Sequence, residues 1–211
     1  MQEDKDGTIF IVDISGYSRF VSAISNESGG LIISNLLEGI IDANFLSFNI
    51  SEIEGDAILF YRHGPVDRVS SILTQFERML NAFDQRVRSY QKNYPQVAKL
   101  SIKLVVHFGT IGRLSVGCYS KIFGRSVVEA HRLLKNNIDS DTYALITDDF
   151  LKQQYESDTD LQSAHACEIY DVGNLCYTYF AFPRKNSDPS NELPVLHNQD
   201  LPTYTQNLLL N

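Results

Sequence analysis

The amino-acid sequence predicts an α/β (α+β) domain, a ferredoxin-like βαββαβ sandwich with further elements appended. Three observations predict this class. Apolar, β-prone runs stand at residues 8–14 and 142–146, and two more fold back on each other between Phe45 and Tyr61. Segments with helical periodicity separate these runs. We therefore expect one domain over residues 1–183, with a sheet whose strand ends are free to build a site.

The first half of the chain supplies a strand, a helical region, a hairpin and a long helix. After the strand at 8–14, a Ser-Gly-Tyr-Ser turn leads into helical spacing, with Ser18 as a helix cap. That spacing continues to Phe45, and Asn26–Gly30 is expected to divide it into two helices. Gly55 and Asp56 mark the bend of the hairpin, and residues 69–90 form the clearest amphipathic helix.

The second half alternates between strands and helices before its composition changes. Residues 100–109 and 114–123 are expected to pair as antiparallel strands across a turn at Thr110–Arg113. The remaining predicted elements are a helix at 126–135, a strand at 142–146, a helix at 148–155, and strands at 166–172 and 175–182. Residues 184–211 are rich in Asn, Asp, Ser and Pro, which predicts an extended tail whose Leu208–Leu210 could dock on the body or on a partner.

Composition limits the classes of function. The 211 residues include 43% hydrophobic residues, enough for the core of one domain. A formal net charge of -8 argues against non-specific binding to nucleic acid or anionic lipid, because both are polyanions. No run approaches the about 18 apolar residues of a membrane span, and the first residues are acidic, so a cytoplasmic protein is expected. Cys118, Cys167 and Cys176 lack zinc-like or redox-like spacing and are expected to be reduced, partly buried thiols.

Two acidic residues stand at neighbouring strand ends. Asp13 ends the first apolar run, and Asp56 lies at the hairpin bend. Hard divalent cations prefer carboxylate oxygens and keep open positions for phosphate, so this pair is a candidate metal site. The alternative is that Asp13 caps a helix and Asp56 is a turn residue. His107 lies in an alternating strand and is expected to pack there instead of acting as a base.

Five motifs in order carry a family resemblance. FIVDISGYSRF, EIEGDAILFY, VVHFGTIG, FGRSVVEAHRLL and YTYF occur in register between residues 8 and 182. Together they resemble the catalytic domain of class III nucleotide cyclases, the adenylyl and guanylyl cyclases, with an uncharacterised bacterial branch as one option. The resemblance implies conversion of a nucleoside triphosphate to a 3',5'-cyclic nucleotide and pyrophosphate. It also implies a homodimer in which each site takes residues from both chains.

The resemblance assigns metal and phosphate ligands. Asp13 and Asp56, joined by the carbonyl of Ile14, would hold two Mg²⁺ or Mn²⁺ ions. The triphosphate would lie against backbone amides where the first helix begins, as anions do at helix N-termini. The residues at that position are Gly16, Tyr17 and Ser18.

The transition-state residues are only partly retained. Arg132 matches the arginine that stabilises charge at the transferring phosphate, so the resemblance makes it catalytic. The asparagine expected four residues earlier is Val128, and the lysine expected within Tyr170–Asn174 is absent. Residues that could compensate are Arg125, Lys121 and Glu129. The alternatives to an enzyme are a degenerate cyclase-homology domain that binds nucleotide or dimerises, and an interaction module without nucleotide.

The base-reading positions of the resembled family are Glu52 and its partner Lys121. An ionised carboxylate only accepts hydrogen bonds and an ammonium only donates them. Such a pair suits an N–H beside a carbonyl, the edge that guanine and uracil both present, so GTP or UTP is favoured over ATP. Certain bacterial members of the family make cyclic pyrimidine nucleotides in anti-phage signalling, so UTP is also a candidate substrate. Without the resemblance, both residues are ordinary polar positions of strands.

Overall fold

The first apolar run forms the central strand of the sheet. The computed structural model describes residues 4–154 and 162–182, so the predicted tail at 184–211 and the end of the predicted helix at Tyr155 lie outside the described residues. The central strand, β1, spans Lys5–Ser15, and its Ile9–Val12 segment is completely buried. Both faces of β1 are therefore covered, which explains why its sequence is continuously apolar instead of alternating.

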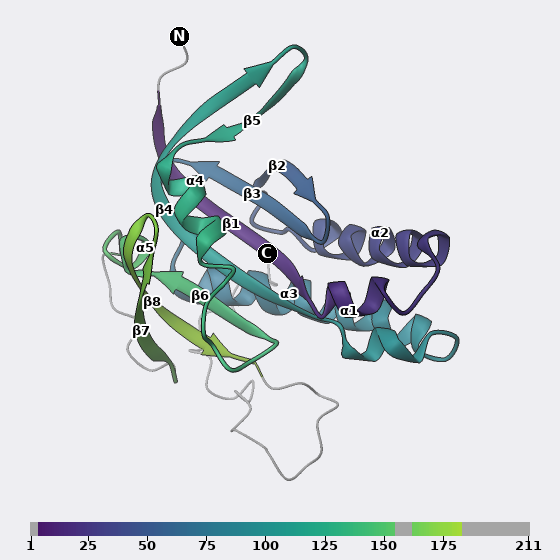
Figure 1. The fold of residues 1–211 in the computed structure, drawn as a ribbon. Coiled ribbons are helices and arrows are strands. Elements are labelled where there is room, and N and C mark those ends of the chain that lie inside the picture. The colour runs from purple at the N-terminus through teal and green to yellow at the C-terminus, as the bar shows by residue number, and fades with distance from the viewer. Residues whose placement is uncertain (1–3, 155–161, 183–211) are drawn as a thin grey trace, which may run out of the picture. The chain divides into compact units, whose positions relative to one another are not determined.

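The strand order confirms the ferredoxin-like prediction. β1 pairs antiparallel with β3 on one side and with β4 on the other, and β2 extends the sheet beyond β3. Parallel pairing of β6 with β4 then adds β8 and β7, giving the order β2-β3-β1-β4-β6-β8-β7, with β5 paired to β4 alone (Figure 1). The strands are β2 (Asn49–Glu54), β3 (Ala57–His63), β4 (Ser101–Val116), β5 (Tyr119–Phe123), β6 (Tyr143–Thr147), β7 (Ala164–Tyr170) and β8 (Gly173–Ala181).

Helices cover both faces of the sheet. The long helices α2 (Asn26–Asp42) and α3 (Val69–Gln91) pack together on one face, and α4 (Arg125–Arg132) lies on the other (Figure 1). Shorter helical segments are α1 (Tyr17–Val21), η1 (Pro95–Lys99) and α5 (Asp148–Leu151). Among the described residues, none of the helices is long and apolar enough to cross a membrane.

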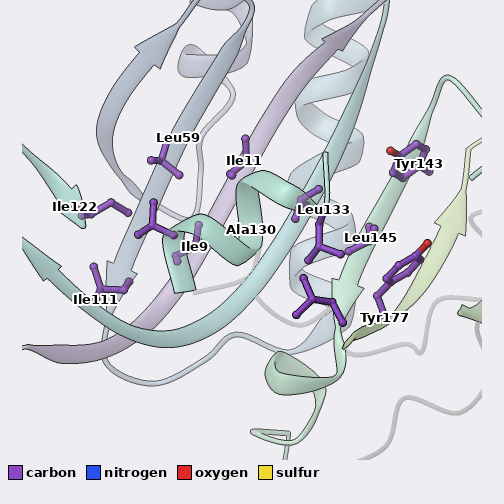
Figure 2. Close-up of a cluster of buried hydrophobic side chains, with 13 residues drawn as sticks. Ile9, Ile11, Leu59, Ile111, Ile122, Ala130, Leu133, Tyr143, Leu145 and Tyr177 are labelled. Carbon is purple, nitrogen blue, oxygen red and sulfur yellow. The ribbon is translucent and has the colours of Figure 1, made fainter. Parts of the chain in front are cut away.

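The core beneath α4 fixes that helix against the central strands. Ile9 and Ile11 of β1 meet Ala130 of α4 and Leu133, the residue that caps this helix, in one buried cluster (Figure 2). Leu145 of β6 and Tyr177 of β8 extend the cluster toward the far edge of the sheet. Removing this apolar surface from water stabilises the position of α4, and with it the position of Arg132 at the helix end.

The turn predicted at Thr110–Arg113 was wrong. β4 continues through these residues to Val116, and the chain reverses at Gly117 and Cys118 instead, with Gly117 at φ 61°. Gly109 lies within the strand because α4 approaches it closely, so that a Cβ there would overlap the side chain of Ser126. Ile111 is almost fully buried, as a strand residue and not as a turn residue.

The two-helix prediction for the segment before Phe45 was correct, but its boundary was misplaced. The break falls at residues 22–25, and Asn26–Gly30 forms the first turns of α2. Ser25 caps α2 by accepting a hydrogen bond from the amide of Ser28. Ser18 lies inside α1 and does not cap it, because Gly16 in the left-handed conformation is the N-cap residue.

The expectation of three reduced thiols was also wrong. Cys167 and Cys176 form a disulfide. They lie directly opposite each other in the antiparallel pairing of β7 and β8, which places their side chains on the same face of the hairpin. Cys118 is exposed at the turn between β4 and β5.

Candidate functional site

Asp13 and Asp56 lie beside each other where β1 approaches the β2–β3 turn. In the sheet, Asp13 is paired with Ala57, the residue after Asp56. The amide of Ile14 donates a hydrogen bond of 3.2 Å to the carbonyl of Asp56, which ties the turn to the end of β1. Gly55, at φ 62°, gives the turn its left-handed residue. The sequence therefore predicted correctly that two strand ends bring these carboxylates together.

The two carboxylates repel each other. Partial burial and, next, the charge of Asp13 raise the pKa of Asp56, to a net value of about 6. A backbone hydrogen bond and the charge of Lys103 act against this rise without cancelling it. Two adjacent carboxylates that are expensive to ionise together form a place where a cation would relieve the repulsion.

Lys103 is a member of the site that the sequence analysis missed. It stands directly opposite Asp13 in the β1–β4 pairing, and its Nζ lies 3.0 Å from Oδ2 of Asp13. The same Nζ donates to the carbonyl of Leu134, just after α4, at 3.1 Å. Lys103 thus connects the acidic pair to the end of α4. A single charge inside the apolar run IKLVVHF was the available signal, but its partner depends on strand register.

The oxygen atoms gathered here fit a hard divalent cation. Two half-buried carboxylates are the ligands that Mg²⁺ and Mn²⁺ accept, and the carbonyl of Ile14 was predicted to join them. Across residues 4–154 and 162–182, no cluster of three or more His, Cys, Asp or Glu side chains is arranged to hold a metal. Asp13 and Asp56 would therefore leave several coordination positions to backbone carbonyls, water or phosphate.

The segment predicted to bind phosphate forms the start of α1. Gly16 has φ 86°, and a Cβ there would lie only 3.0 Å from the carbonyl oxygen of Lys99, so glycine fits this position. The carbonyl of Gly16 accepts from the amide of Phe20 at 3.1 Å, which closes the first turn. Amides at the beginning of a helix have no partner inside it. Those of Tyr17 and Ser18 occupy such positions, four and five residues after Asp13.

Glu52 and Lys121 come together, although 69 residues separate them. Nζ of Lys121 on β5 lies 3.0 Å from Oε2 of Glu52 on β2. The amide of Ile122 donates to the hydroxyl of Ser51 at 3.0 Å, so backbone and side-chain contacts both hold β5 beside β2. The lysine side chain is 50% exposed and the glutamate 23%, which leaves the pair open at the surface.

Arg132 is held at the surface by a partner that the sequence did not indicate. Its Nε and Nη2 donate to the two carboxylate oxygens of Asp171 at 2.8 and 2.7 Å. Asp171 lies in the turn between β7 and β8, within the segment where a lysine was expected. Val128, one turn before Arg132 on α4, is 43% exposed. The helix face that carries Arg132 therefore presents an apolar side chain where the asparagine was expected.

The residues considered as substitutes for the missing groups serve structural contacts. Arg125 donates to Glu129 at 2.7 Å and to the carbonyl of Val172 at 3.1 Å, so it links α4 to the β7–β8 turn. Glu129 also lies 3.3 Å from Nε2 of His107, which is 1% exposed. Burial lowers the pKa of His107, which favours its neutral form. His107 is thus a buried, hydrogen-bonded residue, as the sequence predicted.

A largely apolar pocket of about 790 Å³ reaches Gly55, the residue before Asp56. Its walls come from α1, α2 and the β2–β3 turn. Tyr17 and Gly55 belong to both this pocket and the neighbourhood of Asp13 and Asp56. The remaining lining residues include Val21, Ile33, Leu37 and Ile53.

One family model matches this chain. Residues 33–143 match the family described as "Protein of unknown function (DUF2652)". The matched segment contains Asp56, Lys103 and Arg132 and leaves Asp13 and Asp171 outside. An uncharacterized protein of Mycobacterium tuberculosis, Rv2561/Rv2562, is 26% identical over 165 residues, which cover 75% of this chain and 77% of that protein.

Solved structures of nucleotide cyclases share the fold. The adenylyl cyclase CyaB from P. aeruginosa superposes with a TM-score of 0.64 at 16% identity, covering 86% of this chain and 97% of the other. The guanylyl cyclase Cya2 gives 0.64 at 13% identity, over 87% and 96%. The guanylate cyclase domain of RhGC from Catenaria anguillulae, in complex with GTP, gives 0.56 at 17% identity, over 85% and 99%. At these identities the similarity establishes the fold, which is that of class III adenylyl and guanylyl cyclase domains.

Proposed function

We propose that this chain, which belongs to the family of proteins of unknown function DUF2652, is a metal-dependent nucleotide cyclase. Its substrate would be a nucleoside triphosphate, with GTP or UTP favoured over ATP. The 3'-oxygen of the ribose attacks the α-phosphorus and the bond to the bridging oxygen breaks. The products are a 3',5'-cyclic nucleotide and pyrophosphate, and the hydroxyl proton passes to water.

The observation that carries this proposal is the pairing of Asp13 with Asp56. A chain selected only for stability gains nothing from a partly buried carboxylate at Asp56 whose ionisation is made costlier by a second carboxylate beside it. In this chain, burial and the charge of Asp13 together raise the pKa of Asp56 to about 6. Lys103 compensates one negative charge, and a second compensating charge would come from a bound cation.

A divalent cation held by Asp13, Asp56 and the carbonyl of Ile14 would lower the pKa of the 3'-hydroxyl and neutralise charge on the pyrophosphate. The protein's own groups would orient the triphosphate. The amides of Gly16, Tyr17 and Ser18 at the start of α1 offer donors to its oxygens. Lys103, 3.0 Å from Asp13, offers an ammonium next to the same place.

The preference for GTP or UTP rests on Glu52 and Lys121. Their ion pair at 3.0 Å shows that one acceptor and one donor lie side by side on β2 and β5. A base that shows an N–H beside a carbonyl can replace each partner of this pair with a group of its own. Adenine presents an amino donor beside a ring acceptor, so its two groups would have to bind in the reverse order.

A homodimer with shared sites is supported by the apolar surface around β4, β5 and α4. In Figure 1 the β4–β5 hairpin extends away from the rest of the sheet. Large apolar side chains on it are exposed, and Tyr119 reaches 80%. Exposed apolar patches mark interaction surfaces. The patch comprises Leu114, Val116, Tyr119 and Phe123, together with Val128 on α4.

The alternative is a cyclase-homology domain that binds nucleotide or dimerises without turnover. Two observations favour it: Val128 stands where an asparagine was expected, and Asp171 replaces a cation in the β7–β8 turn by an anion. Groups that stabilise a developing oxyanion are each worth roughly 2.7 to 4 kcal/mol. Losing two of them would slow the reaction by several orders of magnitude.

One assay separates the two functions. The purified chain is incubated with ATP, GTP, CTP or UTP and with Mg²⁺ or Mn²⁺, and cyclic products are detected by mass spectrometry. We expect a cyclic product from GTP or UTP that disappears with EDTA and in Asp13→Asn, but persists in Glu54→Gln, a matched exposed carboxylate beside the turn. Metal-dependent binding of nucleotide without product would favour the alternative. Absence of binding of all four nucleotides would exclude the cyclase and the nucleotide-binding form of the alternative, and would leave only dimerisation.

A further inference from the structure

The contact between Asp171 and Arg132 uses only one side of the guanidinium. A guanidinium offers carboxylates and phosphates two forked edges, one formed by Nε and Nη2 and one formed by Nη1 and Nη2. Asp171 occupies the first edge with two hydrogen bonds of 2.8 and 2.7 Å. The second edge keeps its donors, and the Arg132 side chain is 43% exposed. The ion pair therefore does not consume the arginine's capacity to bind an oxyanion.

The turn that carries Asp171 is fixed on both sides. Arg125, at the start of α4, donates to the carbonyl of Val172 at 3.1 Å. Glu168 on β7 accepts from the backbone amide and the side-chain amide of Asn137 at 3.0 and 2.9 Å. It also accepts from the hydroxyls of Tyr170 and Tyr177. The hairpin is thus attached along α4 and its following loop, and the Cys167–Cys176 disulfide joins its two strands.

This attachment gives the ion pair an orientation that an ordinary surface pair lacks. A free arginine side chain samples many rotamers, and an exposed ion pair contributes little to stability. Here the carboxylate comes from a two-residue turn fastened to α4, and the arginine is the last residue of that helix. The guanidinium is held at both ends, by its own backbone and by Asp171. The Arg132 hydrogen bonds also lower the pKa of Asp171, which keeps it ionised.

We propose that Asp171 is a positioning residue, which holds the Nε–Nη2 edge of Arg132 so that the Nη1–Nη2 edge binds a phosphate oxyanion. The inference rests on the proposed function, because the phosphate is that of the nucleoside triphosphate. It explains how an anion can occupy the turn where a cation was expected without disabling the site. An aspartate in this turn lowers the positive field at the phosphate. It also fixes the direction of the Arg132 donors that remain for the oxyanion.

A measurement that needs no turnover tests the contact. In protein labelled with ¹⁵N-arginine, the Arg132 Nε–H signal is assigned by its absence from Arg132→Lys. We expect slow exchange of this proton with water in the wild type and fast exchange in Asp171→Ala. Slow exchange should persist when inorganic triphosphate and Mg²⁺ are added. If triphosphate speeds exchange to the rate of Asp171→Ala, Asp171 is displaced by the ligand and the inference is wrong.

Kinetics test the positioning. We expect Asp171→Ala to lower kcat roughly tenfold to a hundredfold while KM changes less than about threefold, because the reacting geometry is lost more than binding. Asp171→Glu should recover part of kcat, and Asp139→Ala, an exposed aspartate on the loop after α4, should match the wild type. An unchanged or increased kcat in Asp171→Ala would show that Asp171 merely neutralises Arg132. A wild type without product refutes the proposed function, and the exchange measurement then decides this inference alone.

Discussion

The two halves of the candidate site are held by different forces. Asp13 lies near the end of a strand that is buried on both faces, and Asp56 lies in a turn hydrogen-bonded to that strand. Glu52 with Lys121, and Arg132 with Asp171, are instead ion pairs at the surface. The acidic half is therefore built into the core. The half predicted to read the base and to carry the arginine rests on exposed ion pairs, which contribute little to stability in water.

The difference is consistent with a site whose two halves come from two chains. Carboxylates that must stay close despite their repulsion require a rigid backbone, which the core supplies. Groups that bind a ligand or a second chain would remain exposed until that partner binds. Until then, their ion pairs supply their hydrogen-bond partners. Large apolar residues of β4 and β5 are also exposed, as expected for a surface that a partner would cover.

The largest effect is expected in the acidic half. Asp56→Asn should weaken metal-dependent binding of nucleoside triphosphate at least about a hundredfold, because it removes a ligand charge and leaves the metal with a neutral oxygen. Glu54→Gln, two residues earlier and exposed, should change binding less than about twofold. Calorimetry with Mn²⁺ measures both. Equal losses in the two variants would show that Asp56 has no special role.

The division between chains predicts complementation. Asp56→Ala and Arg132→Ala should each be inactive, since every site in either homodimer lacks one residue. After mixing and subunit exchange, each heterodimer would hold one site with both residues and one with neither. About half of the dimers would be heterodimers, so activity should recover to at most about a quarter of the wild type. Light scattering establishes the dimer and confirms exchange, and no recovery despite exchange would place the whole site in one chain.

The base-reading pair should give an intermediate effect. Exchanging the two roles with Glu52→Lys and Lys121→Asp reverses the hydrogen-bond pattern offered to the base. Unpaired buried polar groups cost roughly 1 to 3 kcal/mol each, so the ratio of kcat/KM for GTP or UTP to that for ATP should fall about fivefold to a hundredfold. The single variants serve as controls, because each leaves two like charges together. A wild type that clearly prefers ATP contradicts this assignment.

The sequence was sufficient for the elements whose pattern is local. A continuous apolar run predicted β1, helical periodicity predicted α3, and Gly55-Asp56 predicted the hairpin. Two glycines near the wrongly predicted turn are instead required by tertiary packing. The turn predicted at Thr110–Arg113 contains Gly112 and follows Gly109, yet Gly109 admits the Ser126 side chain of α4 and Gly112 lies against Asp4. No local pattern distinguishes a glycine needed for close approach from one needed for a turn.

Partners across strands were the part of the site that the sequence could not supply. Asp13 and Asp56 were found because both stand at strand ends. Lys103 was missed because its meeting with Asp13 depends on the β1–β4 register, and Asp171 because it depends on how the last hairpin docks on α4. The disulfide required the register of β7 and β8 for the same reason. Register is set by the hydrophobic pattern of whole strands, not by the residues that meet.

The smallest effect concerns stability, and it links the acidic pair to pH. The folded chain raises the pKa of Asp56 from 3.8 to about 6, chiefly through burial and then through the charge of Asp13. Between these two values the folded state binds more protons than the unfolded state, so stability falls as pH rises through this window. Above about pH 6 the ionised carboxylate destabilises the fold fully, and below about pH 4 it does not destabilise it.

Replacing Asp56 with an uncharged residue should therefore stabilise the protein at neutral pH, in the absence of metal. Because Asp56 is half exposed, solvent screens the effect, and we expect Asp56→Asn to gain about 1 kcal/mol at pH 7.5 and about none at pH 4. Urea unfolding with EDTA at both pH values measures this difference, with Glu54→Gln as the control. A variant that loses nucleotide binding while gaining stability would show that the carboxylate is retained for function. A variant less stable than the wild type at pH 7.5 would show that Asp56 supports the fold, and the repulsion inferred for the pair would be wrong.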